Sequence, residues 1–125
     1  MKVIDTSALI AAILGETGAD AAQAAIAGGC MSLVNVAESI AVLIRKGVTF
    51  DDAVTLVAEA QLVWHSTTIA DAYEAARLVQ TPELSLGDSF CLALAKSLNT
   101  TAVTADRIWA ELNHGVAVEL IRANV

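Results

Sequence analysis

The chain opens with the stretch Val3-Ile4-Asp5-Thr6-Ser7-Ala8-Leu9, in which a short apolar run ends in an acid and leads into an alanine-rich segment. Residues 2–4 have the composition of a strand, and residues 8–14 have the composition of a helix. Asp5 therefore lies where a strand ends and a helix follows. The same alternation of short β-rich runs with longer alanine-rich runs recurs along the rest of the chain.

Further strands and helices are expected downstream of this opening. The strands are expected at residues 30–34, 62–65, 102–104 and 116–120, and the helices at residues 19–27, 36–46, 51–60, 69–79, 88–98 and 107–112. Such alternation indicates an α/β fold with helices on both sides of a mostly parallel sheet. No linker or repeat divides the chain, so residues 1–125 are expected to form a single domain, with Pro82 in a loop.

The composition narrows the class of protein. Hydrophobic residues make up 56% of the 125 residues, which excludes a disordered chain. Polar residues interrupt the longest uncharged stretch, residues 21–37, so no membrane span is expected, and Asp5 interrupts the first apolar run before a signal peptide could form. Two cysteines far apart, Cys30 and Cys91, favour a reducing cytoplasm over a secreted, disulfide-linked protein.

The charge balance excludes the simplest kind of nucleic-acid binder. The chain has 7 Lys and Arg against 14 Asp and Glu, a formal net charge of -7, and no basic run. Its few aromatic residues do not form a stacking platform for single strands. If the protein acts on RNA or DNA, another positive charge must offset its acids, and a bound divalent cation would supply it.

Four acids lie where a strand ends or where a nearby helix begins: Asp5, Glu38, Asp88 and Asp106. In a parallel α/β fold such positions can share one edge of the sheet, which is the edge where ligands bind. Several carboxylates close together repel one another unless a cation is present. Mg²⁺ and Mn²⁺ prefer oxygen ligands, so the four acids predict a site for one of them. Metal-assisted hydrolysis of a phosphodiester follows as the hypothesis.

The same acids also have a purely structural interpretation, which the sequence leaves open. Glu38 could close a capping box with Asn35, and Asp88 could do so with Ser85. The other two acids could simply cap helices. If the site is real, three nearby hydroxyls could orient the acids or a metal-bound water: Thr6, Ser7 and Thr104.

Four segments around these acids, taken in order, resemble the motifs of a known family. The segments are Val3-Ile4-Asp5-Thr6-Ser7-Ala8-Leu9, Ser32-Leu33-Val34-Asn35-Val36-Ala37-Glu38, Leu84-Ser85-Leu86-Gly87-Asp88-Ser89-Phe90-Cys91-Leu92-Ala93-Leu94-Ala95 and Ala102-Val103-Thr104-Ala105-Asp106-Arg107-Ile108-Trp109. The chain resembles the PIN domain and, within it, the VapC-type toxins of toxin–antitoxin pairs. One departure is Ser89, which stands where many relatives carry a basic or small residue.

This resemblance implies a three-layer α/β/α fold around a five-stranded parallel sheet. It implies a Mg²⁺- or Mn²⁺-dependent endoribonuclease in which Asp5, Glu38, Asp88 and Asp106 surround the metal. Asp5, Asp88 and Asp106 would be the most direct ligands, and Glu38 would hold a second ion or orient the attacking water. The resemblance also implies a cognate VapB-like antitoxin that covers the site, and a homodimer.

The residues that would contact RNA are less clearly marked. Candidate phosphate contacts, chosen for their positive charge and their closeness to the motifs, are Arg45, Lys46, Lys96 and Arg107. The first two would suit the C-terminal end of a helix dipole equally well.

Other functions were weighed against a nuclease. His65 and His114 could act as an acid–base pair, but this chemistry needs both beside one phosphate. A phospho-acceptor receiver domain needs a Lys at the last strand, which residues 116–120 lack, and an Asp-x-Asp phosphatase needs an acid where Ser7 stands. A catalytically silent PIN-fold module that binds a protein partner stays open as the alternative.

Overall fold

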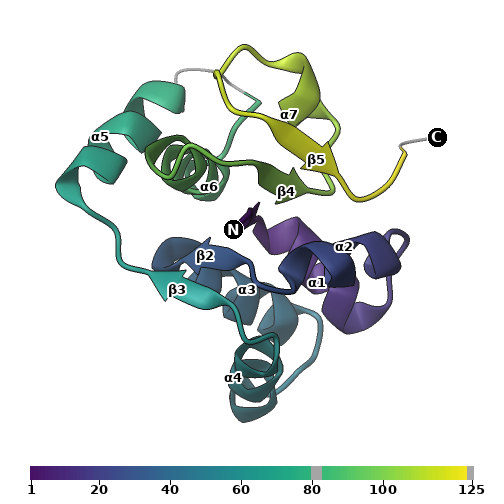
Figure 1. Cartoon of the computed structure of the whole chain (residues 1–125). Helices are drawn as coiled ribbons and strands as arrows, with labels where there is room; N and C mark the ends of the chain where they lie inside the picture. Colours follow the sequence, from purple (N-terminus) through teal and green to yellow (C-terminus); the bar gives the residue numbers. More distant parts are fainter. Residues whose placement is uncertain (80–82, 124–125) are drawn as a thin grey trace.

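Five short strands form one sheet in the computed structural model, which describes residues 1–79 and 83–123 (Figure 1). The strands are β1 (Val3–Ile4), β2 (Cys30–Ser32), β3 (Val63–His65), β4 (Ala102–Thr104) and β5 (Val118–Leu120). Their order is β3-β2-β1-β4-β5, and every pairing is parallel, which confirms the predicted α/β fold. The predicted loop at Pro82 lies outside the described residues.

Helices follow the strands in the predicted alternation. They are α1 (Thr6–Leu14), α2 (Ala19–Ile26), α3 (Leu33–Arg45), α4 (Phe50–Glu59), α5 (Ile69–Leu78), α6 (Leu86–Ser97) and α7 (Ile108–Glu111). None of these described helices is by itself long and apolar enough to cross a membrane, and only α1 and α2 together, bent by 116°, reach the length and composition of a span.

The two faces of the sheet carry different side chains, because successive residues of a strand point to opposite faces. Ile4, Met31 and Val103 pack into one core with α1, α2, α3 and α4. Val3 and Cys30 pack into a second core with α6 and α7, and α5 covers α6. Figure 1 shows these two groups of helices on opposite sides of the sheet, so the fold has the expected three layers.

Helix α3 begins earlier than predicted. The prediction placed its start at residue 36, whereas α3 begins at Leu33, directly after β2. The cause is Ser32, whose Oγ accepts a hydrogen bond from the Asn35 N–H at 3.2 Å and so caps the helix at the last residue of the strand. The strand therefore passes into the helix without a loop.

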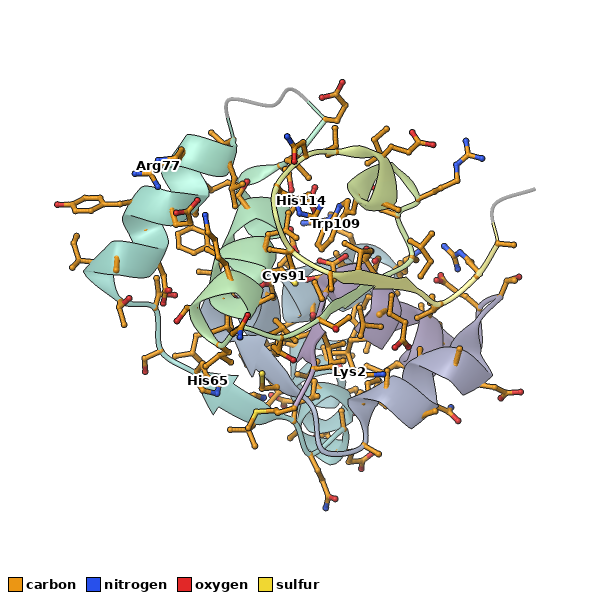
Figure 2. The ribbon with its side chains drawn as sticks, turned by 45° about the horizontal axis from the view of Figure 1, so that its top comes forward. Lys2, His65, Arg77, Cys91, Trp109 and His114 are labelled. Carbon is orange, nitrogen blue, oxygen red and sulfur yellow. The ribbon has the colours of Figure 1, made fainter. Side chains whose placement is uncertain are left out.

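The two histidines lie far apart, which excludes the predicted alternative of an acid–base pair. His65 ends β3, an edge strand, and His114 lies beside β5 at the opposite edge of the sheet (Figure 2). The His114 ring is also engaged in the core, because its Nδ1 accepts from the Val116 N–H at 3.1 Å and its Nε2 lies 2.6 Å from the Trp109 carbonyl. His114 is therefore a structural residue.

One tryptophan and both cysteines lie in the core. Trp109 is fully buried, and both Cys30 and Cys91 are buried free thiols. Burial raises the pKa of Cys91 well above its ordinary value, which argues against a nucleophilic thiolate. Trp64 lies half-exposed on edge strand β3.

Candidate active site

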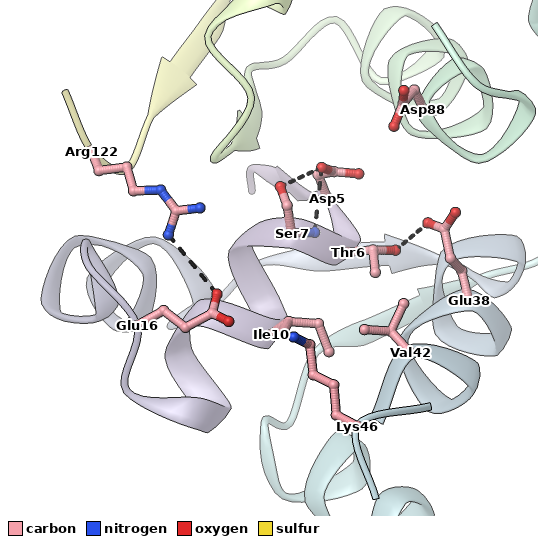
Figure 3. A pocket seen from close by; sticks show the side chains of 10 residues that line it. All are labelled: Asp5, Thr6, Ser7, Ile10, Glu16, Glu38, Val42, Lys46, Asp88 and Arg122. Carbon is pink, nitrogen blue, oxygen red and sulfur yellow. Dashed lines mark hydrogen bonds and ion pairs between the residues drawn. The ribbon is translucent and has the colours of Figure 1, made fainter. Parts of the chain in front are cut away.

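Three of the four predicted acids line one pocket at the carboxyl edge of the sheet (Figure 3). Asp5 follows β1 directly, Glu38 lies in the second turn of α3, and Asp88 lies in the first turn of α6. The pocket has a volume of about 330 Å³. Asp106, two residues after β4, lies outside the pocket lining. Burial raises the pKa of Asp88, and the charges of Glu38 and Asp106 raise it further. The edge rule for parallel sheets thus accounts for three of the four acids lining one pocket.

Asp5 is the most unusual of the acids, because it is buried yet only half satisfied. Its Oδ2 accepts from Ser7 Oγ at 2.6 Å and from Thr104 Oγ1 at 2.9 Å. Its Oδ1 is buried with no hydrogen-bond partner among the described residues, and Figure 3 shows this oxygen on the side of Glu38 and Asp88. Burial raises the pKa of Asp5 to about 7, against the lowering effect of the Ser7 hydrogen bond, and the charges of Asp88 and Glu38 raise it further.

The three predicted hydroxyls each contact one of these acids. Thr6 Oγ1 donates to Glu38 Oε1 at 2.5 Å. Ser7 Oγ accepts from the Ala105 N–H at 2.9 Å, and Thr104 Oγ1 accepts from the Asp106 N–H at 3.1 Å. These backbone hydrogen bonds hold both hydroxyl oxygens in place, and each O–H donates to Asp5 Oδ2. These contacts hold the side chains of Asp5 and Glu38 in place from α1 and β4.

A buried asparagine, Asn35, connects the segments of the site and was not predicted as a functional residue. Its Nδ2 lies 3.3 Å from Glu38 Oε1 and 3.1 Å from the Gly87 carbonyl, and its Oδ1 accepts from Ser32 Oγ at 2.6 Å. Asn35 is fully buried. A polar residue on the inner face of an otherwise apolar helix start was the signal that could have identified it.

The structural interpretation of the acids is partly right. Asp88 does close a capping box, because its Oδ2 accepts from the Ser85 N–H at 2.9 Å while the Asp88 N–H donates to Ser85 Oγ at 3.1 Å. Asp5 is itself the N-cap residue of α1, and its Oδ2 accepts from the Ser7 N–H at 3.4 Å. The expected box between Glu38 and Asn35 is wrong, because Ser32 caps α3 and places Glu38 a full turn too far along the helix. Capping uses one oxygen of Asp88 and leaves the other oxygen available to a ligand.

The donor set fits a hard divalent cation, although the carboxylates are not closed around one position. Within residues 1–79 and 83–123, no three acidic, histidine or cysteine side chains are gathered closely enough to ligate one ion. The fit rests on chemistry: all the donors are carboxylate oxygens, and burial raises the pKa of both Asp5 and Asp88. A cation beside the unpartnered Asp5 Oδ1 would relieve this cost.

Only one of the four predicted RNA contacts lines the pocket. Lys46 does, at the end of α3. Arg45 is exposed next to Lys46 but does not line the pocket. Lys96 and Arg107 also lie outside the lining, and each is near an acid. Lys96 Nζ, near the C-terminal end of α6, lies 3.3 Å from Glu74 Oε2, and Arg107 Nε lies 3.9 Å from Glu111 Oε1.

Two further positions bear on RNA binding. Ser89 is fully buried, its Oγ donates to the Ser85 carbonyl at 3.0 Å, and it does not line the pocket. Arg122 lines the pocket and was missed. Its signal was available in the sequence, because it follows the last strand at the same edge as the acids.

Replacing Gly87 by Ala should separate cleavage from stability. A Cβ at Gly87 would collide with Glu38 Oε2, the end of a flexible side chain, so Glu38 would move while the backbone stays. Because Ala is favoured over Gly inside a helix, we expect the free energy of unfolding to rise by about 0.5–1 kcal/mol or to stay unchanged. Cleavage of RNA should fall by about 10–100-fold, since a misplacement of about 1 Å can cost 100-fold. Urea unfolding and RNA cleavage rates measure the two effects, and wild-type cleavage would contradict a role for Glu38.

Comparisons with known proteins agree with this architecture. The chain matches the PIN domain family over residues 2–115. A toxin–antitoxin complex from Klebsiella pneumoniae is 21% identical with a TM-score of 0.72, and 98% of each chain is covered. VapC20 of Mycobacterium tuberculosis, described as a sarcin–ricin loop cleaving toxin, is 17% identical with a TM-score of 0.71, over 89% of this chain and 94% of that one.

A third similar structure, VapBC-1 from nontypeable Haemophilus influenzae, is 12% identical with a TM-score of 0.72, over 96% of this chain and 97% of that one. No curated protein matches the chain. At these identities the solved structures show a shared fold. The family match itself spans most of the sequence, and the chain therefore belongs to the PIN domain family.

Proposed function

We propose that this protein is a Mg²⁺- or Mn²⁺-dependent endoribonuclease and the toxin of a toxin–antitoxin pair. The observation that carries the proposal is Asp5, a buried carboxylate with one unpartnered oxygen, in a pocket that Glu38 and Asp88 also line. Membership of the PIN family supports a nuclease, and similar folds occur in toxin–antitoxin complexes and in a toxin that cleaves the sarcin–ricin loop.

The four acids divide the work in this proposal. Asp5, Asp88 and Asp106 would hold the cation, which supplies an activated water and stabilises charge on the phosphoryl group. Glu38 would hold a second ion or orient the attacking water, and the Thr6 hydrogen bond fixes its carboxylate for that task. Water attacks phosphorus, the bond to the 3′-oxygen breaks, and the products carry a 5′-phosphate and a 3′-hydroxyl. No side chain forms a covalent intermediate.

The antitoxin belongs to the same proposal. A groove of about 510 Å³ lies between α1, α2 and α4, on the side of the molecule opposite α6 and α7. Its apolar wall includes Leu9, Ile13, Ile26 and Leu56. An amphipathic helix of the cognate antitoxin would bury its apolar face there. VapBC2 from Rickettsia felis and VapBC-1 from Haemophilus influenzae have a similar fold, which supports such a partner.

A homodimer also stays part of the proposal. Edge strand β3 and the first two turns of α5 carry four exposed apolar residues, each between 47% and 69% exposed: Val63, Trp64, Ile69 and Tyr73. These residues offer apolar surface to a second copy of the chain.

The test is cleavage of total cellular RNA by the purified protein free of antitoxin. We expect discrete fragments with Mg²⁺ or Mn²⁺, and no fragments with EDTA or with an Asp88→Asn variant. Absence of cleavage by the folded wild-type protein over a range of RNAs and both metals would overturn the nuclease. A metal titration would then separate the alternatives, because a catalytically silent binding module needs no affinity for Mn²⁺.

A further inference from the structure

Arg122 is a positive charge on the wall of an acidic pocket. The described residues that line this pocket include four acids but two cations, Lys46 and Arg122. Figure 3 shows Arg122 on the side of the pocket away from Asp88 and Glu38. Glu38 and Asp88 therefore lie at one end of the pocket, and the Arg122 guanidinium, with Glu16 beside it, lies at the other.

The fold fixes the position of Arg122 through its neighbours. Ile121 is buried in the core and donates its N–H to the Thr104 carbonyl at 3.1 Å. The turn between α1 and α2 packs tightly on this segment, because a Cβ at Gly18 would lie 2.6 Å from the Ile121 carbonyl oxygen and 3.2 Å from Arg122 Cβ. Arg122 Nη1 donates to the Thr17 carbonyl at 2.9 Å. The side chain is thus held over the pocket and is only about one-third exposed.

The guanidinium has spare hydrogen-bonding capacity. Arginine carries five N–H donors and a permanent positive charge. Among the described residues, the Thr17 carbonyl is the one hydrogen-bond acceptor of the guanidinium, and it takes a single donor on Nη1. Glu16 Oε1 lies 3.9 Å from the same nitrogen, too far for a hydrogen bond. The remaining donors suit the fork-shaped recognition of a phosphate.

We propose that Arg122 binds a backbone phosphate of the RNA strand next to the phosphodiester that is cleaved. This inference rests on the proposed function and deepens it, because it assigns the residue that positions the strand. A strand whose reacting phosphate lies by Asp5, Glu38 and Asp88 needs a positive charge for its neighbouring phosphate, and the chain is acidic overall. Arg122 supplies that charge within the same pocket. Glu16 competes with the phosphate for the guanidinium.

The test measures RNA binding without cleavage. A fluorescent single-stranded RNA is titrated with Asp88→Asn protein in Mg²⁺ over a series of KCl concentrations, with and without Arg122→Gln. We expect Arg122→Gln to weaken binding by about tenfold at low salt, as for a lost charged hydrogen bond. The slope of log K against log[KCl] should become shallower by about 0.7, the value for one phosphate contact on a single strand. In an otherwise wild-type protein, Arg122→Gln should raise KM and leave kcat within about twofold.

Two further variants serve as controls. Arg77→Gln makes the same change in net charge on α5, outside the pocket lining (Figure 2), and should leave the affinity and the slope unchanged. Glu16→Gln removes the competing acid and should tighten binding by a few-fold. Melting temperatures of all variants confirm that the C-terminal segment stays packed.

The outcomes separate this proposal from the proposed function. Equal affinities and slopes for Arg122→Gln and Arg77→Gln would overturn the role of Arg122, while wild-type cleavage of RNA would leave the nuclease standing. A fall in kcat at unchanged KM would also overturn the role in binding. If wild-type protein neither binds nor cleaves RNA, the proposed function fails first and this inference fails with it.

Discussion

Replacing Asp5 by Asn is expected to abolish RNA cleavage and, in the same protein, to stabilise the metal-free fold near pH 8. The Asn carbonyl can still accept the hydrogen bonds from Ser7 and Thr104. The substitution removes the negative charge of Asp5, which burial destabilises. It also replaces Oδ1, the oxygen proposed to bind the metal, with an amide nitrogen. Loss of activity combined with a gain in stability is the behaviour of a group kept for function at a cost to the fold.

The pH dependence of stability gives the sign of this effect. The pKa of Asp5 is about 7 in the fold against 3.8 for an ordinary Asp. The folded protein therefore binds more protons than the unfolded chain between these values, and the free energy of unfolding falls as pH rises from about 4 to above 7. A shift of about 3 units corresponds to at most about 4 kcal/mol. The Asn amide nitrogen would have no hydrogen-bond partner, which costs about 1–3 kcal/mol, so the net stabilisation at pH 8 should be at most about 1–3 kcal/mol.

Urea unfolding of the metal-free proteins between pH 4 and pH 8 measures this. The difference between Asp5→Asn and wild type should widen toward high pH, and added Mg²⁺ should stabilise only the wild type. Asp51→Asn is the matched control, because Asp51 is an exposed acid in the first turn of α4. This substitution should change the free energy of unfolding by less than about 0.5 kcal/mol and should leave cleavage unchanged. A less stable Asp5→Asn protein at every pH would show that the Asp5 carboxylate is structural.

The positions of the strands and helices were predictable because their signals are local. Each strand is a short β-rich run, and each helix a longer alanine-rich run, so the alternation alone indicates the parallel sheet. The start of α3 was misplaced because strand β2 passes into the helix at Ser32 without any turn residue between them. Boundaries of this kind depend on one hydrogen bond, which composition does not report.

The acids were predictable for a different reason. Asp5 and Asp106 follow strands, and a parallel sheet gathers such positions at one edge. The same rule applied to β5 would have identified Arg122. Lys96 was chosen for its closeness in sequence to Asp88, but eight residues of helix separate them by about 12 Å. The number of helical residues between Asp88 and Lys96 already predicts that Lys96 lies too far from the acids to share their pocket.

Asn35 could not be identified in this way, because its partners come from three different parts of the chain. It contacts Thr6 on α1, Glu38 on its own helix and the Gly87 carbonyl on α6. A single sequence shows only that a polar side chain stands among apolar ones. Its importance follows from packing, since a buried donor is stabilising only where acceptors converge on it.

Replacing Asn35 by Leu, which is close to it in size, is expected to destabilise the protein more than any other change at the site. Leu would leave the partly buried Gly87 carbonyl without its donor and the buried Ser32 hydroxyl without its acceptor, although the backbone N–H of residue 35 would still donate to Ser32 Oγ. Each unpaired group costs about 1–3 kcal/mol, so the two together should lower the free energy of unfolding by about 2–6 kcal/mol. Ser39→Ala is the matched control on the same helix, because it removes one buried hydrogen bond, to the Asn35 carbonyl, and should cost only about 1 kcal/mol.

Asn35→Asp separates the role in the site from the role in the fold. Asp keeps the shape and still accepts from Ser32, but it places a carboxylate where the amide nitrogen lies 3.3 Å from Glu38 Oε1. Repulsion should turn Glu38 away, so cleavage should fall by about 100-fold although all four acids are present. Urea unfolding and cleavage rates are compared across Asn35→Asp, Asn35→Leu and Ser39→Ala. If Asn35→Asp loses no more cleavage than Ser39→Ala at equal fraction folded, Asn35 supports the fold alone, and the acids need no such connection to act together.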